Sequence, residues 1–170
     1  MLNKSTDNKA PYFEENKLTT INLVESGGAN LPDQDRVFNN YGSMFKEMSK
    51  RSKDGIITIS IVFGNATAGG AYVPGMSDYT IMQKDQAKVF LAGPPLVKMA
   101  TNEDSSDEEL GGALMHNNLS GVSDFIADDE DEAIKIAREI VDTNIIDKSV
   151  ENLKENNPPI YDKEEILGII

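Results

Sequence analysis

Apolar and polar residues follow two patterns along the chain, one typical of buried strands and one typical of amphipathic helices. Two runs rich in β-branched residues, LTTINLV at 18–24 and IITISIVF at 56–63, predict strands. The second run is almost continuously apolar, which indicates a strand that is buried on both faces. Two shorter runs, YTIMQ from Tyr79 and KVFLAG from Lys88, predict further strands.

Segments with helical spacing lie between and after these runs. The first covers about 36–53 and the last about 130–144. Between them, one segment begins with Pro94 and Pro95, and another begins with the capping box at 106–109. The apolar residues expected to face the core are Val37, Tyr41, Met44, Phe45, Met48, Met99, Leu110, Ala113, Leu114, Ala133, Ile134, Ile136, Ala137, Ile140 and Val141. This order of strands and helices predicts an α/β fold with mainly parallel pairing.

Composition removes several classes of function. The 170 residues are enough for one domain with a core, and the net charge of -13 would be repelled by a phosphate backbone, so nucleic-acid binding is not expected. No apolar stretch approaches the roughly 20 residues of a membrane span, and the start lacks a signal or transit pattern. The expected location is cytoplasmic, or the mitochondrial matrix in a eukaryote. Without cysteine, and with one histidine, no metal site is expected.

The charge is unevenly distributed along the chain. The stretch from Glu103 to Glu132 is rich in Asp and Glu and contains no Lys or Arg. Its simplest interpretation is a solvated acidic face, and the alternative is a docking surface for a basic partner. Residues 1–17 are polar and are expected to be a flexible lead-in, whereas the tail at 155–170 ends on an apolar patch.

The stretch GNATAGGAYVPGMSD, residues 64–78, follows the second strand and contains no His, Cys, Lys or Arg. It fits neither common phosphate-loop pattern. Two interpretations remain open, a tight connection in which the glycines let the backbone turn, and an oxyanion hole.

The oxyanion hole would require a short helix that starts near Ala68 and ends at Pro74 and Gly75. The first N–H groups of a helix have no partner inside it and lie at the positive end of its dipole. Glycine at positions 69 and 70 would let an acyl carbonyl reach them, so this chemistry needs no reactive side chain.

Four blocks carry a resemblance to a known family: VESGGANLP, VFGNATAGGAYVPGMSDYTIM, AKVFLAGPPLVKMAT and DEELGGALMH. In this order they resemble the carboxyltransferase (β) subunits of biotin-dependent acyl-CoA carboxylases. The SGGANLP and TAGGAYVP variants are similar to the methylcrotonyl-CoA and geranyl-CoA carboxylase branch. The resemblance covers about 19–170, with YDKEEILGII similar to the end of the family's N-terminal half-domain.

The resemblance implies a crotonase-like fold, a spiral of ββα units, over 18–170. It implies the transfer of a carboxyl group from carboxybiotin, carried by a biotin carboxylase–biotin carrier partner, to an acyl-CoA enolate. Gly69 and Gly70 match the glycines whose N–H groups hold the enolate oxygen. The expected acyl-CoA contacts are Ser26, Gly27, Gly28, Ala68, Ala71, Tyr72 and Phe90.

Family members carry about a hundred further residues before the first strand and a second crotonase-like half that binds biotin. The active site lies between the N half of one subunit and the C half of another, so a homo-oligomer is implied. This chain is therefore expected to hold the acyl-CoA side of the site and not to carboxylate on its own.

Three alternatives stay open beside this interpretation. A non-catalytic acyl-CoA-binding or assembly module could be made from the same half. A crotonase-type hydratase or isomerase would need a positioned carboxylate, and few acids lie near the glycines. A Clp-type protease would need a serine where Gly69 and Gly70 stand, and no G-x-S-x-G pattern is present, so His116 is expected to be structural.

Overall fold

The computed structural model describes residues 16–28, 32, 34–144, 160–162 and 164. The described residues contain a parallel sheet in the order β1-β2-β3-β5, with β4 paired to the far end of β2. An isolated antiparallel bridge joins Lys88 to Gly112. The mainly parallel pairing predicted from the sequence is confirmed. The strands are β1 (Thr20–Ser26), β2 (Thr58–Thr67), β3 (Tyr79–Gln83), β4 (Lys88–Phe90) and β5 (Phe125–Ala127).

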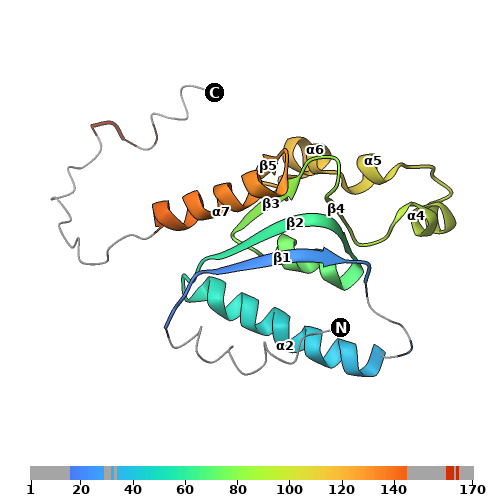
Figure 1. The fold of residues 1–170 in the computed structure, drawn as a ribbon, viewed down its shortest axis with the longest axis horizontal. Coiled ribbons are helices and arrows are strands. Elements are labelled where there is room, and N and C mark those ends of the chain that lie inside the picture. The colour runs from blue at the N-terminus through green and yellow to red at the C-terminus, as the bar shows by residue number, and fades with distance from the viewer. Residues whose placement is uncertain (1–15, 29–31, 33, 145–159, 163, 165–170) are drawn as a thin grey trace.

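Helices connect the strands and cover the sheet (Figure 1). The elements are α2 (Gln34–Lys53), the 3₁₀ helix η2 (Ala68–Ala71), α3 (Tyr72–Gly75), α4 (Pro94–Thr101), α5 (Asp107–Gly111), α6 (Ala113–Met115), the π-helical turn η3 (His116–Ser120) and α7 (Glu130–Asn144). The short helix predicted to start near Ala68 and to end at Gly75 is confirmed, as is the last helix at 130–144.

The core has two parts, one on each face of the sheet. On one face, Ile59 and Ile61 of β2 and Ile81 of β3 pack against α7. On the other face, Val62 and Met82 pack in a cluster that includes Ala71, Val24 and Val89. Successive residues of a strand point to opposite faces, so the apolar run of β2 fills both parts, as its continuous pattern predicts. Figure 1 shows α2 on the side of the sheet opposite α7.

A pair of hydrogen bonds between an aspartate and a threonine closes a ring at the start of each of two neighbouring strands, β3 and β5. The Asp78 N–H donates to the Thr58 carbonyl at 2.9 Å, and the Thr58 N–H donates to Asp78 Oδ2 at 2.7 Å. Asp124 forms the same two bonds with Thr80, at 2.9 and 2.7 Å. Both aspartates follow a serine and precede an aromatic residue, in SDY and SDF. Each ring fixes the register between one strand and the next, because it pairs residues just outside the ladder.

The segment DEELGGALMH does not form one helix. Gly112 is extended (φ -67°, ψ 159°), so α5 ends before it and α6 begins after it. A Cβ on Gly111 would lie 2.5 Å from the Val89 carbonyl oxygen. Gly111 therefore permits close contact between α5 and β4, whereas the Cβ position of Gly112 lies against Glu108 of α5 itself. Helix propensity does not indicate either role. The strand β5 was not predicted, since it has only three residues and Phe125 is exposed.

Three expected core residues are solvent-exposed, so these predictions were wrong. Met99 is 80% exposed, because α4 buries none of its residues against the rest of the described chain. Figure 1 shows α4 projecting from the sheet. Ile134 is 38% exposed, since α7 faces the sheet through Ala133 and Ala137, one helical step away. Leu114, which lies in α6 after the break at Gly112, is half exposed.

The aspartate ring predicts a stability effect. We expect Asp78→Ala to lower the free energy of unfolding by about 1–3 kcal/mol, because the N–H of the buried Thr58 loses its acceptor. Urea denaturation measures the change. Asp54→Ala, in the exposed turn after α2, is the control and should change stability by less than about 0.5 kcal/mol. Equal effects of the two substitutions would contradict this role of Asp78.

The close contact at Gly111 predicts that replacement of glycine by alanine changes stability differently at Gly111 and at Gly42, a second helical glycine. Gly111→Ala should destabilise the fold by about 2 kcal/mol or more, since the new methyl group meets main-chain atoms of Val89. Gly42→Ala should be neutral or stabilise by up to about 1 kcal/mol, because nothing lies within 4 Å of its Cβ position in α2. Thermal unfolding of both variants decides this, and a neutral Gly111→Ala is the contrary result.

Candidate functional site

The chain turns sharply where β2 meets η2. Thr67 is extended (φ -108°, ψ 146°), and the next residue, Ala68, has a φ of +53°. A left-handed conformation costs a residue with a side chain about 1–2 kcal/mol, so the surrounding contacts must hold it in place. Backbone strain of this kind is often found at binding sites, so this turn is a candidate binding site.

Side-chain hydrogen bonds anchor the helices that follow the turn. Thr80 Oγ1 donates to the Pro74 carbonyl at 2.8 Å, and Ser77 Oγ donates to the Val73 carbonyl at 2.9 Å. Ser60 Oγ lies 2.7 Å from Ser77 Oγ and links this network to β2. These bonds bring side-chain donors to carbonyls in the last turn of α3, and they tie α3, which continues directly from η2, to the sheet.

The loop after β1 lies against the same turn. A Cβ on Gly70 would lie 3.0 Å from Ser26 Cβ, so glycine permits close contact between η2 and the end of β1. Gly28, with φ of +102°, lies next to the turn, and its Cβ position is 3.8 Å from the Thr67 carbonyl oxygen. Its N–H donates to Ser26 Oγ at 3.3 Å. The structure thus brings together the expected contacts Ser26, Gly28, Ala68 and Gly70.

An aromatic cluster from α2 and α3 borders the glycines on another side. The Cβ position of Gly69 lies 3.5 Å from the Tyr41 ring. Tyr41 stacks on Phe45 with centroids 5.8 Å apart, and Phe45 contacts Tyr72 at 5.1 Å. The sequence pattern predicts only that Tyr41 and Phe45 belong to the core face of a helix. Their spacing of four residues, which puts two aromatic rings side by side on one helix, could have indicated an aromatic cluster.

The geometry of η2 sets which amides can bind an anion. In a 3₁₀ helix the N–H groups of Ala68 and Gly69 have no carbonyl partner inside the element, whereas the Gly70 N–H faces the Thr67 carbonyl. The described residues offer no further acceptor to either glycine N–H. The short helix carries no charged residue in its first or last turn. The short helix itself therefore offers an anion main-chain dipoles and no side-chain charge.

The other expected contacts have different surroundings. Ala71 is buried in the core beside Val62, so its side chain packs inward. The Phe90 ring packs between the Cβ positions of Gly93 and Gly111, and its backbone pairs with Thr67 at the end of β2. Tyr72 is 46% exposed, and nothing lies within 4 Å of the Cβ position of Gly27. Of these residues, Tyr72 and Gly27 present open surface beside the turn.

His116 is buried and has two hydrogen-bonded ring nitrogens. Its Nε2 lies 2.6 Å from the Val89 carbonyl oxygen and therefore donates to it, and its Nδ1 lies 2.7 Å from Ser120 Oγ. These contacts tie η3 to β4, which agrees with the predicted structural role.

The described residues contain neither a grouped set of possible metal ligands nor a helix that could span a membrane. Among them, no three His, Asp or Glu side chains are grouped so that they could hold a metal ion. No helix in the same part of the chain has the length and apolar character needed to cross a bilayer.

Residues 4–168 match the model of the carboxyl transferase domain family. The chain belongs to this family. It is 54% identical over 156 residues to a probable biotin-dependent acyl-coenzyme A carboxylase beta2 subunit of Mycobacterium tuberculosis, with 92% of this chain and 30% of that protein covered. It is 45% identical over 177 residues to a probable mitochondrial methylcrotonoyl-CoA carboxylase beta chain of Drosophila melanogaster, with coverages of 92% and 31%.

A solved structure shares the fold. The beta subunit of geranyl-CoA carboxylase from P. aeruginosa superposes with a TM-score of 0.75 at 38% identity, covering 98% of this chain and 31% of that one. The family resemblance and the crotonase-like fold class are therefore confirmed. The chain spans about 30% of the length of the curated relatives that it matches.

The strained turn predicts how Ala68 variants behave. Ala68→Gly should be between neutral and about 1 kcal/mol more stable, because relief of the left-handed strain exceeds the entropy that glycine adds to the unfolded chain. Ala68→Val should be at least about 1 kcal/mol less stable, since a β-branched side chain fits this conformation poorly. Urea denaturation ranks the three proteins, and a valine variant as stable as the glycine variant would show that the turn is unstrained.

Proposed function

We propose that this chain binds an acyl-CoA thioester and stabilises its enolate with main-chain N–H groups at the start of η2, as the acyl-CoA side of a carboxyl transfer. The left-handed Ala68 at the junction of β2 and η2 is the observation that carries the proposal. The names of the relatives supply the reaction class, since they are biotin-dependent acyl-CoA carboxylase subunits.

Gly69 and Gly70 are the proposed donors. The Gly69 N–H has no carbonyl partner within η2, whereas the Gly70 N–H faces the Thr67 carbonyl and would share its hydrogen between that carbonyl and the thioester oxygen. As a proton leaves the acyl α-carbon, negative charge develops on the thioester oxygen, and preorganised N–H donors stabilise that charge. Loss of one such donor typically costs about 3 kcal/mol, or 10² to 10³ in rate. Gly70 also keeps η2 close to Ser26, where a side chain would intrude.

The aromatic cluster of Tyr41, Phe45 and Tyr72 provides the proposed apolar surface for the acyl chain. The loop at Ser26, Gly27 and Gly28 lies at the carboxyl end of β1, where ligands of α/β folds commonly bind, and is the proposed contact for the CoA part. Carboxybiotin, brought by a biotin carboxylase–biotin carrier partner, would supply the carboxyl group. A homo-oligomer and a second carboxyltransferase half belong to the same proposal.

Gly69 offers the sharper test, because its Cβ position has only ordinary contacts, whereas that of Gly70 is crowded by Ser26 at 3.0 Å. We expect Gly69→Val to weaken the binding of an acyl-CoA at least about tenfold and to leave the binding of free CoA unchanged. Gly75→Val is the matched control in the same helical segment, since nothing lies within 4 Å of its Cβ position. Calorimetric titration of the full chain measures both, and circular dichroism checks the folds.

Turnover distinguishes the enzyme from a binding module. The chain is assayed with and without a biotin carboxylase–biotin carrier partner, ATP and bicarbonate. Carboxylation that requires both proteins and falls by about 10² or more in Gly69→Val supports the proposal. Binding without turnover in the complete mixture favours the acyl-CoA-binding or assembly module. Acyl-CoA affinity equal in Gly69→Val and wild type would refute the assigned oxyanion hole.

A further inference from the structure

A concave surface that does not include the glycine turn is lined by residues of the β3–β4 connection, α5, α6 and η3. Its cavity of about 550 Å³ is lined by Asp85, Glu108, Glu109, Leu114, Met115 and Leu119. We call this surface the acidic cleft. Leu114 is 50% exposed and Leu119 is 82% exposed, although both lie in ordered helical segments. Two leucines beside one cavity, uncovered by the described chain, present an apolar floor to solvent.

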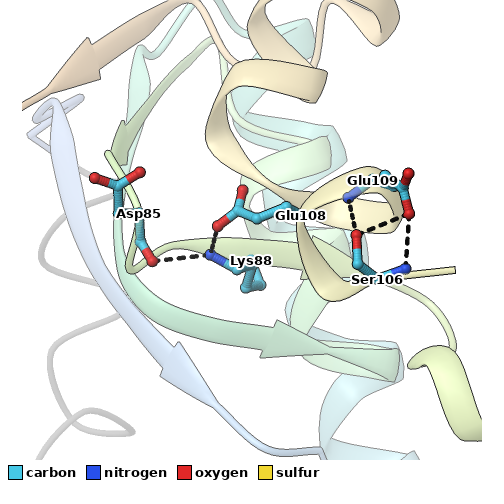
Figure 2. A network of polar contacts seen from close by, with 5 residues as sticks. All are labelled: Asp85, Lys88, Ser106, Glu108 and Glu109. Atoms are coloured by element: carbon cyan, nitrogen blue, oxygen red, sulfur yellow. Dashed lines mark hydrogen bonds and ion pairs between the residues drawn. The ribbon is translucent and has the colours of Figure 1, made fainter.

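The rim of the acidic cleft is built from carboxylates that local structure holds in place (Figure 2). Glu109 Oε2 accepts hydrogen bonds from the Ser106 N–H at 2.9 Å and from Ser106 Oγ at 2.8 Å. The bond from the Ser106 backbone N–H, followed by that from its side chain, lowers the pKa of Glu109 below its ordinary value. The Glu109 side chain is therefore charged at neutral pH. Asp85 lies in the β3–β4 turn with φ of +62°.

The nearby lysines do not neutralise this rim. Lys88 is buried, and its ammonium group forms an ion pair with Glu108 and donates to the Asp85 carbonyl at 3.0 Å. Figure 2 shows Lys88 between these two residues. Lys84 lies 3.7 Å from Asp128. The stretch 103–132 contributes no Lys or Arg of its own. Asp85 and Glu109 thus keep a net negative charge around an apolar floor.

We propose that the acidic cleft docks a short amphipathic helix of a partner protein that presents two apolar side chains flanked by lysine or arginine. Apolar anchors in a groove supply affinity, and charges around the rim supply orientation and association rate. A second copy of this chain suits the surface less well, because in a symmetric pairing the two acidic rims would face each other. A cleft of this size supports a small, transient interface whose affinity falls with salt.

The probe is a labelled helical peptide of about 14 residues with two leucines at i and i+4, otherwise alanine and lysine. Fluorescence anisotropy with the full chain should show binding that weakens as salt rises. Two control peptides keep the length and change one property each, leucine to serine or lysine to glutamate, and neither should bind. Absence of binding by the lysine–leucine peptide, or equal binding by a control peptide, overturns the proposal.

Protein variants locate the contact. Leu114→Ser with Leu119→Ser should weaken peptide binding about tenfold or more, whereas Leu96→Ser, at an exposed leucine of α4, should not change it. Asp85→Asn with Glu109→Gln should weaken binding about three- to tenfold and flatten its salt dependence. Asn tolerates the left-handed turn at 85, and Gln preserves the capping box at 109, so both folds should survive.

Sedimentation equilibrium tests whether a second copy of this chain binds the acidic cleft in place of a partner helix. The chain without peptide should show no association through this surface. A concentration-dependent dimer that the double serine variant abolishes would assign the acidic cleft to a second copy and overturn the proposal. Equal peptide affinity in wild type and the double serine variant would overturn it as well, since the leucines would then lie outside the contact.

Discussion

The turn between β2 and η2 depends on contacts that outweigh the strain of a left-handed Ala68. Thr80 and Ser77 hold the far end of the helical segment through the carbonyls of Pro74 and Val73. Ser26 packs against Gly70 on the side of β1. These contacts join three neighbouring strands to one short segment of main chain. The segment therefore has a fixed direction, which is what a main-chain donor needs if it is to meet developing charge without reorganisation.

Much of this arrangement follows from residue patterns. The continuous apolar run at 56–63 predicts a central strand buried on both faces, and β2 occupies that position. The capping box at Ser106 and Glu109 and the prolines at 94 and 95 predict helix starts that the structure confirms. These signals are local, because a cap or a buried strand depends on nearby sequence and on a period of two or 3.6 residues.

Other features depend on contacts between distant segments. From the sequence, Gly111 is only a residue of low helix propensity. In the structure, it lets α5 contact the backbone of Val89. Tyr41 has the pattern of a helix core residue, and its position beside Gly69 follows from how α2 packs on the sheet. Met99 has the same apolar character but lies on α4, which is uncovered in the described chain. Periodicity predicts that a face is apolar and does not identify what covers it.

The central claim concerns polarisation of a thioester carbonyl by main-chain N–H groups, and vibrational spectroscopy measures it directly. An acyl-CoA labelled at the thioester carbonyl carbon is compared free and bound by isotope-edited infrared difference spectroscopy. The account predicts a lower carbonyl stretching frequency on binding, and loss of that shift when the Gly69 amide is replaced by an ester. An unchanged frequency for the bound thioester would contradict the account.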